Sequence, residues 1–377
     1  MAGAGINADI GPVADAAELR EVQRFKYDIY VAEMGRYGAI ADHENRLLIE
    51  ADDATSHVYR ARVDGRLAAT MRLTWGGDGA LGARHLEQYD LAPFLDAVPP
   101  GEIVVGERMM IDPAFRGTSL LVEMFTAFMR FVNERRIQLV FGDCEPHLLN
   151  TYQALGYRTY TARNVNSPET GYLIPLVIVP EDMAYMRRIG SPLAGVLRDF
   201  GAGARVPGGI DALLAGGAAV QSHKLLDPEE YLAGVKAAAR EADALDSGLF
   251  RGMGEAEIAV CLEKSVTIAC RPGDRVIKRG NVATNMGLVL SGRFEVRDGE
   301  TVVAEIGPGE VIGEIAFFLK LPRTMDVVAT SEDTRIVSFN DRTLRNLVES
   351  HSETAATLLY NISVMLCARL QKTNELL

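Results

Sequence analysis

The sequence predicts an α+β protein with a mixed α/β sheet domain, a helical connector and an antiparallel β-barrel of jelly-roll type that ends in a helix. A chain of 377 residues is too long for one ordinary core. Its first part alternates strand and helix periodicity, and its last part consists of short strands separated by regularly spaced glycine turns. We expect the boundaries 1–182, 183–247 and 248–377.

Composition and charge restrict the function. The chain is 48% hydrophobic and 24% charged, as soluble globular proteins are, and its net charge of −12 argues against general nucleic-acid binding. A local basic pocket for an anionic ligand is compatible with that charge. The N-terminus lacks a signal peptide's basic and apolar regions, no run of 18 apolar residues indicates a transmembrane helix, and the cysteines show no metal-ligand spacing. We expect a cytoplasmic protein with buried, reduced cysteines and no metal.

The first domain is expected to begin with an amphipathic helix over 17–37. Alternating residues on both sides of Asp64-Gly65 predict a hairpin with a type I′ turn. Further along, EIVVGERMMID predicts a buried strand, 119–135 a long helix, IQLVFGDC a second buried strand, and the surroundings of Tyr152 a short helix.

Residues 183–245 are rich in alanine and glycine and predict a connector that is helical in places, notably over 228–244. Beyond the barrel, the chain turns helical from Arg342, with leucines and isoleucines on one stripe. That stripe either pairs two chains into a homodimer or packs on the barrel.

The segment GEIAFFLKLPRT, 313–324, has the composition of an anion site. Gly313 allows a ligand close to the backbone, and the following turn presents N–H groups. Glu314 suits a ribose hydroxyl, and Arg323 can pair with a phosphate. The alternative is a degenerate barrel in which Arg323 pairs with Glu314.

This segment resembles the phosphate-binding cassette of cyclic-nucleotide-binding domains, over about 249–377. The resemblance implies a nucleotide site made by Gly313, Glu314, Ile315, Ala316, Arg323 and Thr324. Departures at Ile312, Gly287 and Met325 leave the base open, so the implied effector is cyclic AMP, with cyclic GMP as the alternative.

An enzyme that moves an acyl group from a thioester to an amine must hold the phosphopantetheine arm, deprotonate the amine and protonate the thiolate. After the strand ending near Ile111, a turn opens a helix whose N–H groups can cradle phosphate oxygens; it comprises Arg116, Gly117, Thr118 and Ser119. This turn resembles the acyl-CoA motif of GNAT enzymes, although Ser119 and Leu121 stand where that family usually has glycine.

The GNAT resemblance implies that Tyr152 protonates the thiolate and that Glu107 acts as a base through water. Tyr152 could equally be a packed aromatic, and Glu107 a buried ion-pair partner of Arg72 or Arg108. His147 is a rival base on a loop.

The segment RFKYDIYVAEMGR, the acidic stretch after it and Met71-Arg72-Leu73 resemble autoinducer synthases and long-chain N-acyl amino acid synthases. The resemblance covers about 17–180 and implies transfer from acyl-CoA or acyl carrier protein to the amine of an amino acid, with Arg72 or Arg108 holding its carboxylate unless they form structural salt bridges. We therefore expect a cyclic-nucleotide-regulated N-acyltransferase. The alternatives are a nucleotide-regulated protein lysine acetyltransferase and a non-catalytic nucleotide sensor.

Overall fold

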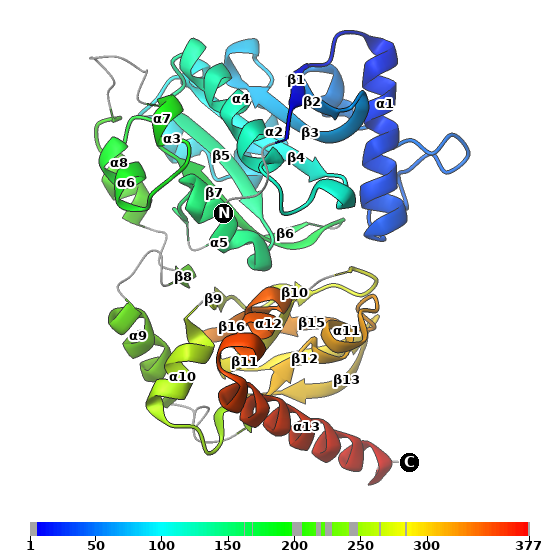
Figure 1. The fold of residues 1–377 in the computed structure, drawn as a ribbon, viewed down its shortest axis with the longest axis vertical. Coiled ribbons are helices and arrows are strands. Elements are labelled where there is room, and N and C mark those ends of the chain that lie inside the picture. The colour runs from blue at the N-terminus through cyan, green and yellow to red at the C-terminus, as the bar shows by residue number, and fades with distance from the viewer. Residues whose placement is uncertain are drawn as a thin grey trace. The chain divides into compact units, whose positions relative to one another are not determined.

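A computed structural model describes residues 6–161, 163–167, 169–197, 206–215, 220–222, 228–240, 248–263, 265–282 and 285–375. The chain divides into two compact units (Figure 1). Unit 1 comprises Met1–Cys144, Thr151–Thr161 and Ile174–Gly217, and unit 2 comprises Glu145–Asn150, Ala162–Leu173 and Ala218–Leu377. The connector predicted over 183–247 is therefore divided between them.

A mixed sheet forms the centre of unit 1. Its strand order is β1 (Ala8–Pro12), β2 (His57–Val63), β3 (Arg66–Trp75), β4 (Ile103–Ile111), β5 (Leu139–Cys144), β7 (Gly171–Ile178) and β6 (Val165–Ser167). All neighbours are antiparallel except β4 and β5, which are parallel. The predicted strands at β4 and β5 are confirmed.

The β2–β3 hairpin shows how local sequence fixes the register. Val63 pairs with Arg66, and both turn residues have positive φ, 50° at Asp64 and 77° at Gly65. This is the type I′ turn that Asp-Gly favours, so the prediction is confirmed.

Helices of unit 1 follow the hydrophobic periodicity. They are α1 (Ala16–Lys26), α2 (Ala83–Gln88), α3 (Ala92–Leu95), α4 (Leu120–Glu134), α5 (Leu149–Leu155), α6 (Met183–Arg188), α7 (Ala194–Leu197) and α8 (Ile210–Leu214). The predicted helices at α4 and α5 are confirmed. The helix expected over 17–37 is α-helical only to Lys26 and continues as a π-helix over Tyr27–Glu33.

Unit 2 contains two antiparallel sheets, as the fold class predicted, although they are not assembled as one closed barrel. One sheet has the order β10 (Arg275–Ile277), β15 (Asp326–Ala329), β12 (Phe294–Asp298) and β13 (Thr301–Ile306). The other has β14 (Val311–Ile312), β11 (Asn285–Ser291), β16 (Thr334–Asn340), β9 (Val266–Cys270) and β8 (Val220–Ser222). The last strand, β8, comes from the connector, where the sequence indicated only helices.

Five helices of unit 2 lie in the described residues: α9 (Pro228–Arg240), α10 (Glu255–Leu262), α11 (Glu314–Leu319), α12 (Asp341–Ser350) and α13 (Ser352–Glu375). In the stripe of α13, Leu358 and Ile362 belong to the core of unit 2, whereas Leu370 is 62% exposed. Cys144, Cys261 and Cys270 are buried as expected, but Cys367 on α13 is exposed, so the expectation for that cysteine is wrong.

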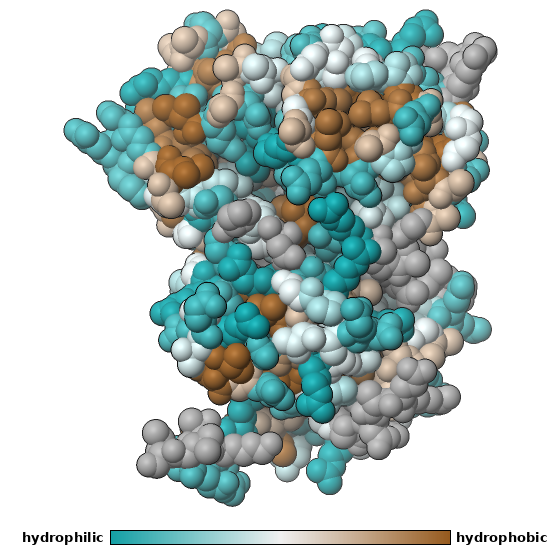
Figure 2. Space-filling view, turned by 180° about the vertical axis from the view of Figure 1, so that it is seen from behind, coloured by the Kyte–Doolittle hydropathy of each residue, from teal (hydrophilic) through white to brown (hydrophobic). Residues whose placement is uncertain are grey.

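The visible face in Figure 2 shows hydrophobic patches that hydrophilic residues interrupt. Among the described residues, we find no helix that is both long and apolar enough to cross a membrane.

Two glycine turns of unit 2 give a matched test of the packing. Gly292 and Gly299 both have positive φ, 75° and 62°, but a Cβ on Gly292 would lie 2.6 Å from the Thr334 Cα, whereas a Cβ on Gly299 would meet nothing within 4 Å. We expect Gly299→Ala to lower the free energy of unfolding by about 1 kcal/mol. Gly292→Ala should cost about 3 kcal/mol or more, because a backbone neighbour must move. Equal losses in urea unfolding would contradict this packing.

Candidate active site and nucleotide-binding site

In the sheet of unit 1, strands β4 and β5 are paired over only part of their length. They pair only over Ile103–Val105 and Leu139–Phe141. Beyond these residues β4 pairs with β3 alone, and β5 pairs with β7 alone. The two backbone edges that face each other past Val105 and Phe141 are therefore not bonded to one another.

A bulge in β4 lies just beyond this point. Arg72 pairs with Glu107 and Thr70 with Met110, so Arg108 and Met109 together oppose the single residue Met71. Arg108 has a φ of 55°, which is unusual for a residue other than glycine. Bulges re-aim side chains and are common beside active sites. This one places Glu107 and Arg108 in different ion pairs.

Glu107 is buried between two arginines. Its Oε2 accepts hydrogen bonds from the Nη2 atoms of Arg72 and Arg84, both at 3.0 Å, and its Oε1 accepts from Arg84 Nη1 at 2.8 Å. The ion pair with Arg72 that the sequence left open is therefore present, and a second pair with Arg84 accompanies it. Burial alone would raise the pKa of Glu107, but hydrogen bonds from His85 and Arg84 and the charge of Arg72 hold it well below its usual range.

In the same cluster of charges, the carboxylates Glu50 and Asp53 also have basic partners. Glu50 accepts from Arg108 Nε and Nη2 at 2.9 and 2.6 Å, and Lys26 Nζ donates to Glu50 at 2.9 Å and to Asp53 at 2.7 Å. Although burial raises the pKa of Glu50, the charges of Arg108, Arg72 and Lys26 lower it below its usual range. The predicted acceptor-binding residues Arg72 and Arg108 thus already have carboxylate partners.

Three side chains of this cluster have the donor atoms of a metal site. Atoms of Asp52, His85 and Glu107 lie within 4.8 Å of one another. However, Arg84 donates to Asp52 at 2.5 Å as well as to Glu107, so a guanidinium already provides the positive charge there. The donor set does not fit a cation.

Tyr152 lies on α5 among aromatic rings. Its ring centroid is 5.4 Å from that of Tyr157 and 5.9 Å from that of Phe125. Burial, reinforced by Cys144, Tyr157 and Asp143, raises the pKa of Tyr152 well above its usual value. The phenol therefore keeps its proton at neutral pH, as a proton donor must. The packed-aromatic alternative is compatible with the same contacts.

The residues predicted to bind phosphate lie between the end of β4 and the start of α4. Arg116 Nε donates to the Ile111 carbonyl at 3.0 Å, and its two terminal nitrogens donate to Glu33 at 2.6 and 2.9 Å. Thr118 Oγ1 donates to the Phe115 carbonyl at 2.6 Å, and Ser119 precedes α4 as its N-cap. The Arg116–Glu33 pair is partly exposed, so its net contribution to stability is small and an anion can compete with Glu33.

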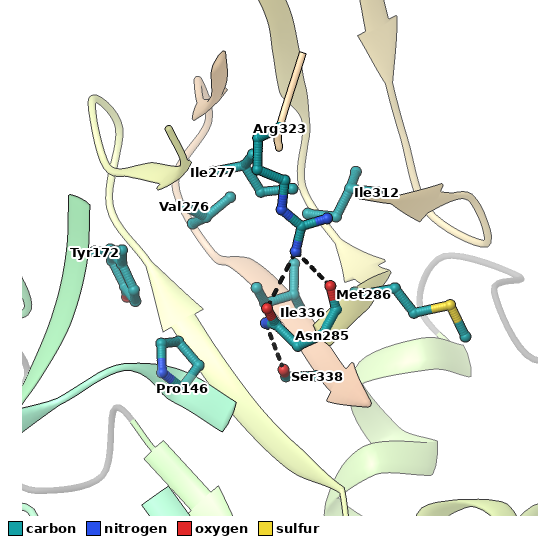
Figure 3. A pocket seen from close by; sticks show the side chains of 11 residues that line it. Pro146, Tyr172, Val276, Ile277, Asn285, Met286, Ile312, Arg323, Ile336 and Ser338 are labelled. Carbon is teal, nitrogen blue, oxygen red and sulfur yellow. Dashed lines mark hydrogen bonds between the residues drawn. The ribbon is translucent and has the colours of Figure 1, made fainter. Parts of the chain in front are cut away.

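In unit 2 the predicted nucleotide cassette surrounds Arg323. The guanidinium is buried and donates to the Gly313 carbonyl. It also donates to the Asn285 carbonyl and to Asn285 Oδ1 at 3.1 Å (Figure 3). Burial lowers the pKa of Arg323 to about 10, partly offset by Glu314, so the side chain is still cationic at neutral pH. Of the other predicted residues, Ala316 is buried and Ile315 and Thr324 are exposed.

Glu314 does not pair with Arg323, contrary to the degenerate-barrel alternative. It is buried, and Oε1 accepts from Arg369 Nη1 of α13 at 2.7 Å. Arg369 Nη2 also donates to the Val311 carbonyl at 2.9 Å. The last helix is therefore tied to the carboxylate that the family resemblance assigns to ribose.

A small pocket of about 20 Å³ lies beside Arg323, which is room for about one water molecule. Its lining includes strand residues such as Ile277, Ile312 and Ile336, and also Pro146 and Tyr172 (Figure 3). Asn285 Nδ2 donates to Ser338 Oγ at 3.2 Å on its floor. The walls are mostly apolar with a few polar groups, as in ligand sites, but a nucleotide needs more room than this pocket provides.

Sequence reasoning missed several residues of both sites. Arg84 and His85 lie in a short helix without a motif, and Arg369 is one basic residue in a long helix. Asp143 carried a usable signal, since it is the one charged residue in the mostly apolar run IQLVFGDC.

Two family models match the chain. Residues 21–173 match "N-acyl amino acid synthase FeeM", and residues 267–351 match "Cyclic nucleotide-binding domain". The chain joins an N-acyl amino acid synthase-like domain to a cyclic nucleotide-binding domain. The two resemblances predicted from the sequence are thereby confirmed.

Curated relatives match one part or the other. An L-ornithine N(alpha)-acyltransferase of Rhodobacter capsulatus is 30% identical over 158 residues, 39% of this chain and 60% of that protein. The acetyltransferase Pat of Mycolicibacterium smegmatis is 34% identical over 94 residues, 24% and 28% of the respective chains. A CRP-like cAMP-activated global transcriptional regulator of Mycobacterium tuberculosis is 26% identical over 134 residues, 34% and 58%. The chain thus spans less than two thirds of each of these relatives.

Among solved structures, that of FeeM, an N-acyl amino acid synthase from uncultured soil microbes, aligns with a TM-score of 0.37 and 14% identity. The alignment covers 50% of this chain and 97% of that one.

The buried ion pairs of the FeeM-like domain predict a pH-dependent stability. In Arg72→Met, Glu50, Asp53 and Glu107 lose a buried partner, which should lower the free energy of unfolding by about 3–5 kcal/mol at pH 7. The folded-state pKa values of Glu50 and Glu107 lie below their unfolded values, so this stabilisation is full above the ordinary glutamate pKa of about 4.3 and is lost as pH falls. The gap between variant and wild type should shrink below about pH 5.

Denaturant unfolding at pH 7 and pH 4 measures this gap. The control is Arg62→Met, which removes pairs with Glu18 and Glu21 near the surface and should cost about 1 kcal/mol or less. A penalty at Arg72 that is small, or the same at both pH values, would contradict the charge compensation.

Proposed function

We propose that this chain is an N-acyltransferase that moves an acyl group from acyl-CoA or acyl carrier protein to the amine of an amino acid or related small molecule. We further propose that a cyclic nucleotide bound in unit 2 regulates the transfer. The proposal assigns the acyltransferase to residues 1–182, the connector to 183–247 and the nucleotide domain to 248–377.

The observation that carries the proposal is the parting of β4 and β5. Past Val105 and Phe141 each strand keeps a backbone edge that its former neighbour does not bond. A phosphopantetheine arm contains two amides, which can pair with such edges as a strand would. Beyond the β4 edge the chain reaches the Arg116 turn, and beyond the β5 edge it reaches Tyr152 on α5.

Each predicted site residue then has a role in the proposed acyl transfer. Arg116 exchanges its partly exposed partner Glu33 for a phosphate of the donor, with help from Gly117, Thr118 and Ser119 at the start of α4. Tyr152 protonates the departing thiolate. Glu107, which Arg72 and Arg84 hold as an anion, was predicted to act as the base through water.

The charged cluster supports a zwitterionic acceptor. Arg72 and Arg108 are enclosed by carboxylates, whereas the Arg84 side chain is 40% exposed and that of Asp52 is 32% exposed. An amino acid can place its carboxylate on the partly exposed Arg84 without burying an unpaired charge. The match to an L-ornithine N(alpha)-acyltransferase supports an acceptor of this class.

Regulation follows from the contact between Glu314 and Arg369. A ribose hydroxyl that bonds Glu314 competes with the Arg369 guanidinium for the same oxygens. Nucleotide binding therefore favours a state in which α13 is released, and the shift equals the difference in nucleotide affinity between the two states. The match to a cAMP-activated regulator supports cyclic AMP over cyclic GMP as the effector. Pairing of two chains through α13 stays a prediction.

A second candidate function is acetylation of protein lysines under nucleotide control, which the 34% identity to the acetyltransferase Pat favours. The two candidates differ in donor and acceptor. Lipid-amide synthesis needs a long acyl thioester and a free amino acid, whereas protein acetylation needs acetyl-CoA and a lysine side chain.

Mass spectrometry of the products tests both. The purified chain is incubated with acetyl-, decanoyl- or palmitoyl-CoA and with free amino acids including L-ornithine, or with a lysine peptide, in the absence and presence of cyclic AMP or cyclic GMP. We expect an N-acyl amino acid from a long-chain donor, at a rate that cyclic AMP changes about tenfold, which corresponds to about 1.4 kcal/mol of coupling. Acetylated peptide as the only product would favour the second candidate. If no amide forms under any condition, the remaining interpretation is a non-catalytic nucleotide sensor.

Nucleotide binding has its own test. Arg323→Lys replaces a planar, bidentate donor with a point charge, so cyclic AMP affinity measured by calorimetry should fall about a hundredfold. Arg297→Lys is the control, because Arg297 lies on β12 and pairs with Glu295 at 2.6 Å. The affinity of this variant for cyclic AMP should match that of the wild type. Unchanged binding in Arg323→Lys would overturn the assignment of the phosphate site.

A further inference from the structure

Asp143 is the second carboxylate at the parting of the strands. It lies on β5 two residues past Phe141, where the pairing with β4 ends, and pairs with Pro175 of β7. Its side chain is partly exposed. Cys144, the next residue, ends the strand, and α5 with Tyr152 follows shortly afterwards.

The contacts of Asp143 differ in kind from those of Glu107. Both of its hydrogen bonds come from neutral groups and end on Oδ2: the Tyr89 hydroxyl donates at 2.9 Å, and Gln88 Nε2 donates at 2.7 Å. Among the described residues, nothing donates a hydrogen bond to Oδ1, and no basic side chain forms an ion pair with Asp143. One oxygen is held in place while the other is available.

The groups around Asp143 connect it to the rest of the site. The Tyr89 hydroxyl that bonds Asp143 also lies 3.3 Å from Glu107 Oε1, so one phenol links the two carboxylates. The other titratable groups that act on it, or on which it acts, come from β4, from α5 and the segment after it, and from the first helical segment and the loop that follows: Arg108, Tyr152, Tyr157, Tyr160, Tyr30 and Tyr37. Apart from Glu107 and Arg108, these groups are neutral at pH 7.

We propose that Asp143 Oδ1 is the proton acceptor for the amine in acyl transfer, and that Glu107 is a positioning residue that fixes Arg72 and Arg84. This inference rests on the proposed N-acyltransferase function and changes which carboxylate does the proton chemistry there.

The step balances without any further reactant. The ammonium of the acceptor first releases one proton to water, which leaves an uncharged amine. Oδ1 then takes one further proton from the amine nitrogen as the nitrogen electron pair forms the C–N bond to the thioester carbonyl carbon. The C–S bond breaks, and its electron pair leaves on sulfur, which takes the phenolic proton of Tyr152. The proton on Asp143 then returns to the Tyr152 phenolate through water, so both residues regain their starting states.

The pKa values of the two carboxylates differ in the direction that this assignment of roles requires. Burial and the charge of Glu107 raise the pKa of Asp143, whereas the pKa of Glu107 is held well below its usual range. A general base works best when its pKa approaches the working pH, and paired carboxylates pushed apart in this way commonly divide the acid–base roles. Glu107 binds a proton too weakly for that task.

The test is the pH dependence of kcat/KM for amide formation from a long-chain acyl-CoA and the best amino acid found. The wild-type rate should fall on the acidic side as the base becomes protonated. Asp143→Asn should lower the rate about 10²–10⁴-fold and remove that acidic limb. Thermal unfolding shows whether the variant is folded.

Glu107→Gln provides the contrast. It removes the negative charge that raises the pKa of Asp143, so the acidic limb should persist and move to lower pH. If Glu107 is the base, this variant loses the limb instead, and the inference is overturned.

Tyr89→Phe decides the matter if Asp143→Asn does not fold. It keeps the carboxylate but removes a donor that stabilises the ionised form, so the limb should move to higher pH. A limb that stays in place, or a folded Asp143→Asn variant with wild-type rate and profile, would refute the role of Asp143 while leaving the enzyme an acyltransferase. A wild-type chain that forms no amide would instead refute the proposed function, and this inference with it.

Discussion

The site in the acyltransferase unit depends on one constraint, the end of the β4–β5 pairing at Val105 and Phe141. Up to that point the strands are ordinary parallel neighbours. Past that point, β4 has a bulge at Arg108 and pairs with β3, whereas β5 continues along β7. The separation leaves Glu107 on one strand and Asp143 on the other without a ladder between them.

Charge compensation gives these two carboxylates different roles. Arg72 and Arg84 surround Glu107, while Asp143 receives only the phenol of Tyr89 and the amide of Gln88. Residue type alone does not distinguish the two. In unit 2 the same principle reappears, since the buried Glu314 accepts a hydrogen bond from Arg369 of the last helix.

The sequence predicted what depends on local pattern. The Asp64-Gly65 hairpin, the strand containing Glu107 and the cassette with Arg323 follow from turn chemistry, apolar runs and a spaced motif. It did not predict contacts between distant residues. The π-helical continuation of α1 after Lys26, the pairing of β8 with β9 and the Glu314–Arg369 bond each depend on tertiary packing, which periodicity does not encode.

A crystal structure with a non-hydrolysable acyl-CoA thioether would show whether the acyl thioester enters where β4 and β5 separate. We expect the pantetheine amides to bond the strand edges past Val105 and Phe141, with the reactive carbon between Asp143 and Tyr152 and the phosphates at the Arg116 turn. Pantetheine bound elsewhere, with the strand edges and the Arg116–Glu33 pair unchanged, would contradict the account.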